Sequence, residues 1–289
     1  MNWPRLTPSA HPEGSVVFGV SRPDTVVGVT RIAVLMSHHY GAQPLAVHVA
    51  GGHKPTWEGA VDLEGERLFE IARAEAETLG YPLRSYSEFA VDVVAGIRQA
   101  ADALQPHVVV LGQSIAHRAT GFARIADAVT AGRTWPLILT KLGVSEPFRS
   151  VLVPLTIPSE LARLQPVLSV LGEIATEQTR LLFLVHAATL AADVERQREE
   201  LTLVADSMSL AGQILYRTVV DISPVEAILE ARTENDVVVM NTAGDRTSPS
   251  VFSRSLAEEV AQSTNLPILL VRGDLRPQRE LRNLDDDEK

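Results

Sequence analysis

The stretch from Val237 to Gly273, VVVMNTAGDRTSPSVFSRSLAEEVAQSTNLPILLVRG, contains the residues of this chain that are best placed to bind an anion. An apolar run, a loop of small and polar residues, an amphipathic stretch and a second apolar run predict a strand, a loop, a helix and a strand. Backbone N–H groups at a helix N-terminus bind phosphate, and small residues let the ligand approach the backbone. The loop and the start of the helix also carry hydroxyl and guanidinium groups that can hold an anion, on Thr242, Arg246, Arg254 and Ser255.

Residue patterns typical of catalysis or of a metal site do not occur in the sequence. There is no G-x-S-x-G, H-E-x-x-H or Walker pattern, and no serine stands with a histidine and an aspartate in a recognisable order. His38, His39, His48 and His53 are close in sequence, but no carboxylate lies at a ligand spacing from them. Nucleotide hydrolysis would need a metal-holding carboxylate in the loop, and the obvious candidate, Asp245, is a residue type common in turns. We therefore predict no catalytic residue, no metal and no enzyme activity.

The elements that position this loop belong to an internal repeat. Four segments recur in the same order at nearly constant spacing, and the pairs are 16–21 with 151–156, 46–49 with 184–187, 107–112 with 236–241, and 135–139 with 266–270. The chain is therefore predicted to hold two copies of one domain, 15–142 and 148–273, joined by a short turn-rich linker. The acidic segment 274–289 is expected to be a disordered tail.

Each copy alternates short apolar runs rich in β-branched residues with longer amphipathic stretches. This pattern predicts an α/β fold with two doubly wound domains, each with a five-stranded parallel sheet covered by helices on both faces. The ligand crevice of such a sheet lies at the carboxyl ends of its strands. Ser159 and Ser223 are expected to cap two helices of the second copy. The strands predicted in that copy are 150–156, 180–186, 214–220, 235–241 and 267–272.

Composition narrows the classes of function. The 289 residues carry a formal net charge of −10 with a pI near 5.3, and no basic stripe is present to bind a nucleic-acid backbone. The absence of cysteine excludes disulfides and thiolate metal sites. No apolar run reaches the roughly 18 residues that span a bilayer, and the N-terminus has no apolar signal core. We expect a cytoplasmic protein with no nucleic-acid partner and no direct membrane insertion.

The second copy resembles the universal stress protein family. Its residues 237–272 follow the C-terminal signature of that family, a strand, a small-residue loop, a helix and a final strand, at Met240, Gly244, Ser255, Ala257, Glu258, Val260, Pro267, Ile268 and Val271. The opening Val-Leu-Val-Pro at 151–154 and the strand ending at His186 add to the likeness, which extends more faintly through the first copy. The resemblance implies a Rossmann-like domain with five parallel strands, paired with another copy through its last strand. Residues 137–140 and 268–271 are apolar enough to pair in this way and to form one continuous sheet.

The signature departs from the family pattern where ATP-binding members place glycines against the phosphates. In the second copy, Asn241 and Arg254 stand at two of the three glycine positions, and Thr156 replaces the aspartate that contacts the nucleoside. The first copy keeps Gly112 but has Ile115 at the next glycine position, so this copy is expected not to bind a nucleotide. The candidate nucleotide-binding residues are therefore Thr156, Met240, Asn241, Thr242, Gly244, Arg254 and Ser255.

Two interpretations of the second copy stay open. Its loop is either a polar turn on a scaffold that has lost the ancestral site, or a site in which Arg254 replaces backbone contacts with a charged contact to ATP, another nucleotide or another anion. The resemblance favours a non-enzymatic stress-response or regulatory module, with intramolecular domain pairing and a homodimer as candidate assemblies. The alternative is a cytosolic accessory domain that partners a membrane transporter of the amino-acid permease or cation/proton antiporter type. An exposed apolar patch outside the paired last strands would favour the accessory domain, whereas a well-formed crevice in the second copy would favour the sensor.

Overall fold

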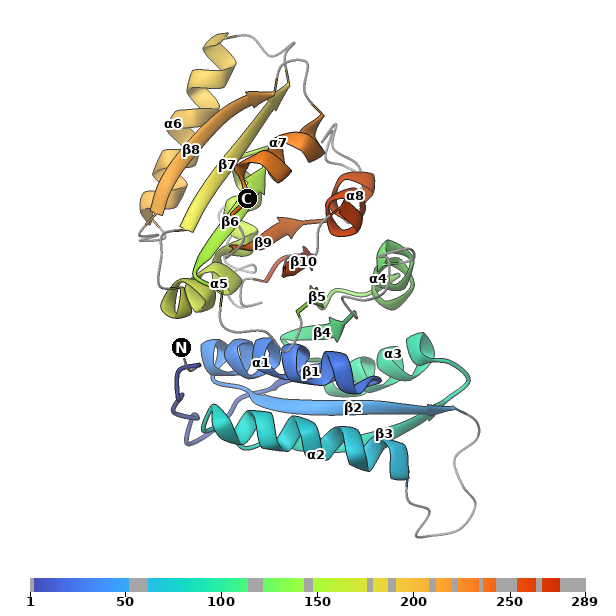
Figure 1. Cartoon of the computed structure of the whole chain (residues 1–289). Coiled ribbons are helices and arrows are strands. Elements are labelled where there is room, and N and C mark those ends of the chain that lie inside the picture. The colour runs from blue at the N-terminus through green and yellow to red at the C-terminus, as the bar shows by residue number, and fades with distance from the viewer. Residues whose placement is uncertain are drawn as a thin grey trace, which may run out of the picture.

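The computed structural model describes most of the chain, namely residues 3–51, 62–113, 122–142, 148–175, 179–186, 191–207, 212–219, 223–233, 236–242, 254–263 and 267–275. Strands and helices alternate through both copies (Figure 1). The elements of the first half are β1 (Ser15–Gly19), α1 (Pro23–Tyr40), β2 (Gln43–Gly51), α2 (Leu63–Thr78), β3 (Arg84–Ala90), α3 (Val93–Leu104), β4 (Val108–Gly112), α4 (Phe122–Thr130) and β5 (Leu137–Lys141). Those of the second half are β6 (Ser150–Leu155), α5 (Ser159–Ile174), β7 (Thr179–His186), α6 (Ala191–Ser207), β8 (Gly212–Val219), α7 (Pro224–Ala231), β9 (Asp236–Asn241), α8 (Arg254–Ser263) and β10 (Ile268–Arg272).

The two five-stranded sheets predicted from the sequence are halves of a single sheet. Its ten strands follow the order β3-β2-β1-β4-β5-β10-β9-β6-β7-β8, so each half has the same internal order. All pairs are parallel except β5 with β10, which run antiparallel with Leu139 opposite Leu270. Two parallel sheets that meet through equivalent strands are related by a rotation of about half a turn, and this rotation reverses the strand direction at the junction. The predicted pairing of 137–140 with 268–271 into one continuous sheet is confirmed.

Helix starts in the second half follow local side-chain chemistry. Ser223 precedes α7 and forms a capping box with Glu226, whose Oε2 accepts the Ser223 N–H at 3.3 Å. The predicted cap at Ser159 is wrong, because Ser159 is already the first residue of α5 and Pro158 takes the N-cap position without a side-chain hydrogen bond. Instead, Glu160 reaches back to the end of β6, where its Oε2 accepts the Thr156 N–H at 2.8 Å. This contact satisfies a backbone donor between strand and helix.

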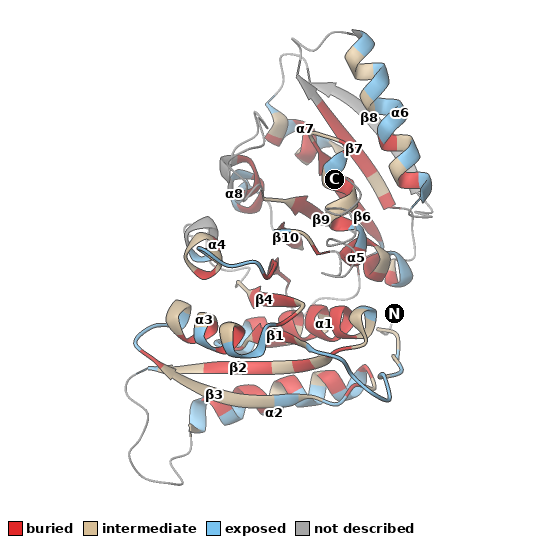
Figure 2. Cartoon of the chain, turned by 180° about the vertical axis from the view of Figure 1, so that it is seen from behind, coloured by how far each residue is buried: buried red, intermediate tan, exposed pale blue. Residues whose placement is uncertain are grey.

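The two large hydrophobic cores lie on opposite faces of the sheet, and each draws residues from both halves (Figure 2). One core packs under α1, α2, α5 and α6, and the other packs under α3, α4, α7 and α8. Successive strand residues alternate between the two, so that Val239 faces the first core and Met240 the second. At the junction, α1 meets α5 on one face and α4 meets α8 on the other. The halves therefore share their packing across the β5–β10 pair.

The ends of the predicted domains are described only in part. Residues 143–147, the predicted linker, and 276–289, most of the predicted tail, lie outside the described residues. Leu275 is buried, and its carbonyl oxygen accepts the Tyr40 hydroxyl at 2.5 Å. Among the helices in the described part of the chain, none combines the length and the apolar character needed to cross a membrane.

Candidate functional site

The carboxyl ends of β6 and β9 bring the first sequence-predicted site residues together. Thr156 directly follows β6, Asn241 ends β9, and Thr242 follows it, and these two strands are neighbours in the sheet. Thr156 donates through its N–H and its hydroxyl to Glu160 Oε2 at 2.8 and 3.0 Å. Thr242 donates through the same two groups to the Val271 carbonyl oxygen at 2.7 and 3.2 Å. Both threonines thus hold the strand ends in place.

The remaining predicted residues are placed differently. Met240 of β9 is buried at 4% exposure in the core between the sheet and helices α7 and α8, so its side chain does not face the carboxyl edge. Arg254 and Ser255 are the first two residues of α8. Gly244, like most of the loop before α8, lies outside the described residues.

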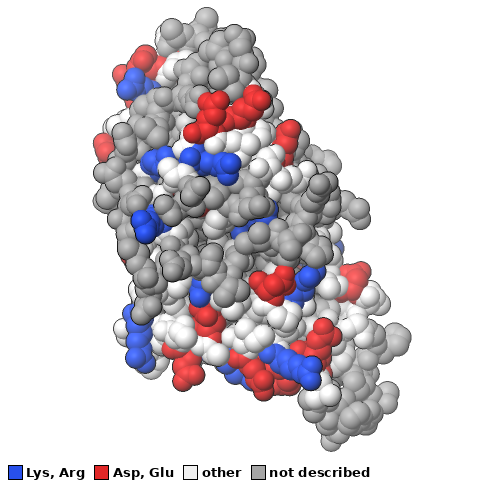
Figure 3. Space-filling model, in the orientation of Figure 1, with Lys and Arg blue, Asp and Glu red and all other residues white. Residues whose placement is uncertain are grey.

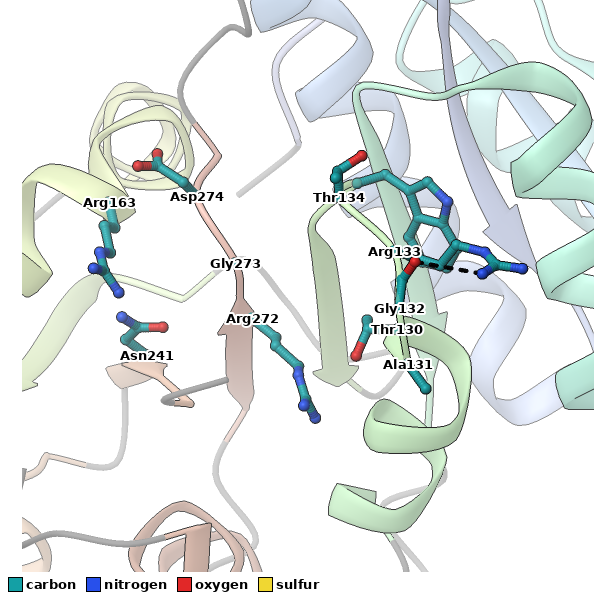
Figure 4. Close-up of a pocket in the computed structure, with 11 residues that line it drawn as sticks. Thr130, Ala131, Gly132, Arg133, Thr134, Arg163, Asn241, Arg272, Gly273 and Asp274 are labelled. Carbon is teal, nitrogen blue, oxygen red and sulfur yellow. Dashed lines mark hydrogen bonds between the residues drawn. The ribbon is translucent and has the colours of Figure 1, made fainter. Parts of the chain in front are cut away.

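A cavity of about 480 Å³ lies beside Asn241, at the carboxyl ends of β9 and β10 (Figure 4). Its lining combines residues of both halves: Thr130, Ala131, Gly132, Arg133, Thr134, Trp135, Arg163, Asn241, Arg272, Gly273 and Asp274. The antiparallel junction explains this composition, because Arg272 at the end of β10 stands opposite Leu137 at the start of β5. The loop that enters β5 therefore closes the side of a crevice that belongs to the second half.

Sequence reasoning identified only Asn241 among these lining residues. The predicted pairing of 137–140 with 268–271 could have indicated the lining residues of the loop before β5, whereas no sequence signal pointed to Arg163 of α5. If those strands pair antiparallel, the segment before 137 must lie beside the end of 268–271.

Three arginines line the cavity and differ in their partners. Arg272 forms an ion pair with Asp127 of α4. Arg133 makes two hydrogen bonds of 2.6 Å each to the carboxylate of Asp102, and these bonds hold the pKa of Asp102 below its usual range. Arg163, on α5, is half-buried and makes no hydrogen bond or ion pair within the described part of the chain. Arg163 is therefore the cavity arginine most available to a ligand.

Comparisons with known proteins bear on the fold. No family model matches the sequence, and no curated protein matches it. A universal stress protein from Archaeoglobus fulgidus DSM 4304 matches the structure with a TM-score of 0.56 and 15% identity, over 89% of this chain and 96% of that one. A putative universal stress protein from Pseudomonas aeruginosa UCBPP-PA14 matches with a TM-score of 0.59 and 11% identity, over 89% and 91% of the two chains. The chain has the universal stress protein fold.

The same fold occurs in a second kind of solved structure. The cytoplasmic domain of a prokaryotic cation chloride cotransporter matches with a TM-score of 0.63 and 10% identity. The match covers 92% of this chain and 97% of that one, so it extends through both halves. These likenesses show the fold alone, so the local chemistry of the site must carry any functional argument.

The carboxyl edge of the first half of the universal stress protein fold is filled by internal contacts. His48 at this edge of β2 is buried, with Nδ1 2.9 Å from the Val20 carbonyl oxygen and Nε2 3.5 Å from Asp62 Oδ2. Burial acts to raise the pKa of Asp62, but hydrogen bonds from the Gly65 N–H and the Ser87 hydroxyl, together with His48, lower it overall. The carboxylate is thus held ionised between β2, β3 and the start of α2.

Backbone packing also closes this edge near β4. A Cβ on Gly112 would lie 3.1 Å from the Cβ of Thr25, so α1 packs directly on the strand end. The next residue, Gln113, donates its N–H to the Thr140 carbonyl oxygen at 2.8 Å. Among the described residues, no group of three or more histidine, aspartate or glutamate side chains is arranged to hold a metal ion. Ile115 and His53 lie outside the described residues.

Proposed function

We propose that the chain is a non-enzymatic regulatory module of the universal stress protein type, which responds to a nucleotide or another anion at the carboxyl edge of its second half. The observation that carries this proposal is the cavity of about 480 Å³ lined by Arg163, Asn241 and Arg272. Its volume lies in the range of about 300–1,000 Å³ that small-molecule sites occupy. The position also agrees with the general rule that α/β sheets bind ligands beyond the carboxyl ends of their strands.

In this proposal the two halves have different tasks. The segment 148–273 binds the ligand through the cavity and through the start of α8, where Arg254 and Ser255 lie. The segment 15–142 supports it through the shared sheet and supplies the loop before β5. On the face drawn in Figure 3, the described Lys and Arg side chains lie among Asp and Glu side chains. This interspersed charge suits a cytoplasmic protein that binds a small anion better than one that binds a polyanion.

Calorimetric titration of the full chain with ATP, ADP and AMP tests the proposal. We expect at least one nucleotide to bind, and we expect Arg254→Gly to weaken the binding because it removes a cation at the start of α8. Arg73→Gln is the matched control, since Arg73 lies on α2 and does not line the cavity. Absence of binding by the native chain, or equal weakening by both substitutions, would contradict the nucleotide-sensing proposal.

A second candidate function is that of an accessory domain partnering a membrane transporter. The likeness to a cotransporter cytoplasmic domain over nearly the whole chain supports it. A second observation is the exposure of three apolar side chains near the carboxyl ends of β2 and β3: Leu63 at the start of α2 is 73% exposed, and Val91 and Val93 at the start of α3 are 82% and 52% exposed. These residues lie away from the β5–β10 junction, and exposed apolar groups of this kind are typical of protein interaction sites.

Fractionation of the source cells tests this candidate. If the apolar surface holds a membrane-embedded partner, part of the chain should sediment with membranes, and Val91→Ser with Val93→Ser should release it. Leu203→Ser, at an apolar position of α6 that is 70% exposed, is the matched control. A chain that stays entirely in the supernatant, or one released equally by the control, would contradict the accessory role.

A further inference from the structure

The cavity extends around the carboxyl edge of the sheet from one face to the other. Because strand residues alternate, Asn241 lies on the face of Val237 and Val239, under α5, whereas Arg272 lies on the opposite face, toward α4. Gly273 and Asp274 cross the edge between them, and the first-half loop 130–135 forms the remaining wall. A single ligand in this cavity would therefore contact both halves of the chain.

One end of the cavity is lined by two polar side chains, Arg163 and Asn241. Arg163 and Asn241 point toward one another from α5 and the end of β9 (Figure 4). Neither side chain makes a hydrogen bond or an ion pair within the described part of the chain. A guanidinium fork beside an amide donor matches an oxyanion, because both groups can donate to its oxygens at once.

The other end of the cavity holds an arginine that already has a partner. Arg272 pairs with Asp127, and the two side chains are 15% and 28% exposed. An ion pair of this kind can exchange one anionic partner for another when a ligand of higher charge enters. Asp127 lies on α4, so this exchange would remove a contact that ties α4 of the first half to β10 of the second.

We infer that the cavity is a site for a small organic phosphate, with one anionic group held between Arg163 and Asn241 and a second taken up by Arg272 in exchange for Asp127. The volume of about 480 Å³ exceeds what a bare phosphate ion needs, so the ligand carries an organic body or a second phosphoryl group. At each end a phosphoryl group fits better than a carboxylate, because it carries more negative charge and offers more oxygens to the donors there. The inference rests on the proposed function only in that the second half binds an anion.

Ligand binding at this site would change the contacts between the two halves beside the β5–β10 pair. The ligand bridges Arg163 of the second half and the loop 130–135 of the first, while α4 loses its bond to Arg272. Ligand binding then changes how α4 is held beside α8. The regulated element is thus α4.

Calorimetry on the full chain with pyrophosphate, inorganic phosphate, AMP and succinate tests the inference. We expect pyrophosphate, which carries two phosphoryl groups, to bind more tightly than inorganic phosphate or AMP, which carry one each, and we expect succinate to bind least. Arg163→Gln should weaken pyrophosphate binding by roughly tenfold or more, the loss expected for a charge-assisted hydrogen bond. Asn241→Ala should weaken it less, and Arg73→Gln should leave it unchanged. Circular dichroism of each variant checks that the fold is retained.

Asp127→Asn is the decisive variant, because the exchange predicts an increase in affinity. Without the carboxylate, Arg272 is available to the ligand, and pyrophosphate should bind several-fold more tightly, roughly 3- to 10-fold for a released charge pair. Unchanged or weaker binding in Asp127→Asn would overturn the exchange. Equal losses in Arg163→Gln and Arg73→Gln, or a preference for succinate, would overturn the site.

The outcomes separate this inference from the proposed function. If nucleotides bind in a manner that depends on Arg254 but not on Arg163, the proposed function stands and the organic-phosphate site in the cavity is wrong. If pyrophosphate binding depends on Arg163 while no nucleotide binds, the cavity site stands and nucleotide sensing is wrong.

Discussion

The carboxyl edges of the two halves are built from equivalent elements, but the edge of the first half is closed and that of the second half borders a cavity. Lys141 ends β5 and Arg272 ends β10, so the two cations hold corresponding positions. Lys141 is 3% exposed and donates from Nζ to the Ala261 carbonyl oxygen of α8 at 2.8 Å. Arg272 instead pairs with Asp127 of the corresponding helix α4 and lines an open cavity. The same backbone plan can thus close one edge with a lysine and keep the other accessible with an arginine.

The difference extends to the rest of each edge. In the first half, His48, Asp62 and Ser87 bond with one another and with the backbone, leaving their polar groups committed to the fold. In the second half, Arg163 and Asn241 face each other without a hydrogen bond in the described part of the chain. A ligand held by Arg163 and Asn241 would therefore displace no hydrogen bond of theirs in the described part of the chain, and the described ion pair that it would break at this edge is that of Arg272 with Asp127. This contrast supports the assignment of ligand binding to the second half.

The largest expected effect comes from breaking the junction that creates both edges. Leu270 is 2% exposed and stands opposite Leu139 in the β5–β10 pair. Leu270→Asp places a carboxylate in the core shared by the halves, and we expect the free energy of unfolding to fall by about 4 kcal/mol. Urea denaturation followed by circular dichroism measures this change.

A control variant and the number of unfolding transitions make the urea denaturation test more specific. Leu203→Asp, at an exposed position, should change the free energy of unfolding by less than about 0.5 kcal/mol. Because both large cores contain residues of both halves, we expect the native chain to unfold in one transition. Two separate transitions would show that the halves fold independently.

A smaller loss is expected when the cation that closes the first edge is removed. Lys141→Ala deletes a buried side-chain stem and leaves the Ala261 carbonyl oxygen without this donor, so we expect a loss of about 2 kcal/mol at neutral pH in urea denaturation. Arg272→Ala, at the equivalent position of the second edge, should lower the free energy of unfolding by about half as much, because the Arg272 side chain is only part-buried and borders the cavity. Equal losses of stability in Lys141→Ala and Arg272→Ala would contradict the proposed difference between the closed first edge and the second edge, which borders the cavity.

The pH dependence of Lys141 provides an independent test. Burial lowers the pKa of Lys141, so the unfolded chain binds this proton more tightly than the folded chain does. The native chain should therefore gain stability relative to Lys141→Met as the pH rises from the lowered pKa toward the ordinary value of about 10.4. A constant difference between the two proteins across this alkaline range would contradict the burial of a charged lysine.

Asp62→Ala removes the α2 cap and the acceptor of the Ser87 hydroxyl. We expect this substitution to lower the free energy of unfolding by about 1–2 kcal/mol. The lowered pKa of Asp62 gives the sign of the pH dependence. The contribution of the Asp62 carboxylate to the free energy of unfolding should be present in full above the ordinary aspartate pKa of about 3.9. It should disappear as the pH falls through the lowered pKa. Acid unfolding of the native chain and of Asp62→Asn measures it, with the α3 cap variant Asp92→Asn as the control.

The smallest effects on stability are expected at the second edge. Asp127→Asn should lower the free energy of unfolding by no more than about 1 kcal/mol, since the pair with Arg272 is only part-buried. Arg163→Gln should change the free energy of unfolding by less than about 0.5 kcal/mol, because Arg163 makes no hydrogen bond or ion pair within the described part of the chain. Thermal denaturation of both variants measures these differences. A loss at Arg163 as large as that at Lys141 would mean that Arg163 is a structural residue.

Much of the fold followed from local patterns. The predicted strand at 150–156 corresponds to β6, and the one at 235–241 corresponds to β9, because runs of apolar β-branched residues predict buried strands well. The cap at Ser223 was also predictable from four consecutive residues. The cap at Ser159 was not, because Glu160 reaches back to Thr156 and α5 starts one residue earlier than the cap requires.

The candidate site was predictable only in part. The sequence directed attention to Asn241 because a glycine is replaced there, and the structure places Asn241 in the lining of the cavity. It did not indicate Arg163, which lies in an ordinary amphipathic helix, or the loop 130–135, which is far away in sequence. Whether Arg254 and Ser255 join a ligand there stays a prediction.

The sequence by itself determined the repeat, the alternation of strands and helices, and the apolar character of the two last strands, because these depend on residue type and spacing along one segment. Only the tertiary structure decided that the end of β10 meets the loop before β5, and that Lys141 is covered while Arg272 is accessible. The physical reason is that the antiparallel register joins segments more than a hundred residues apart, and this register emerges only when both halves bury their apolar faces in the same two cores.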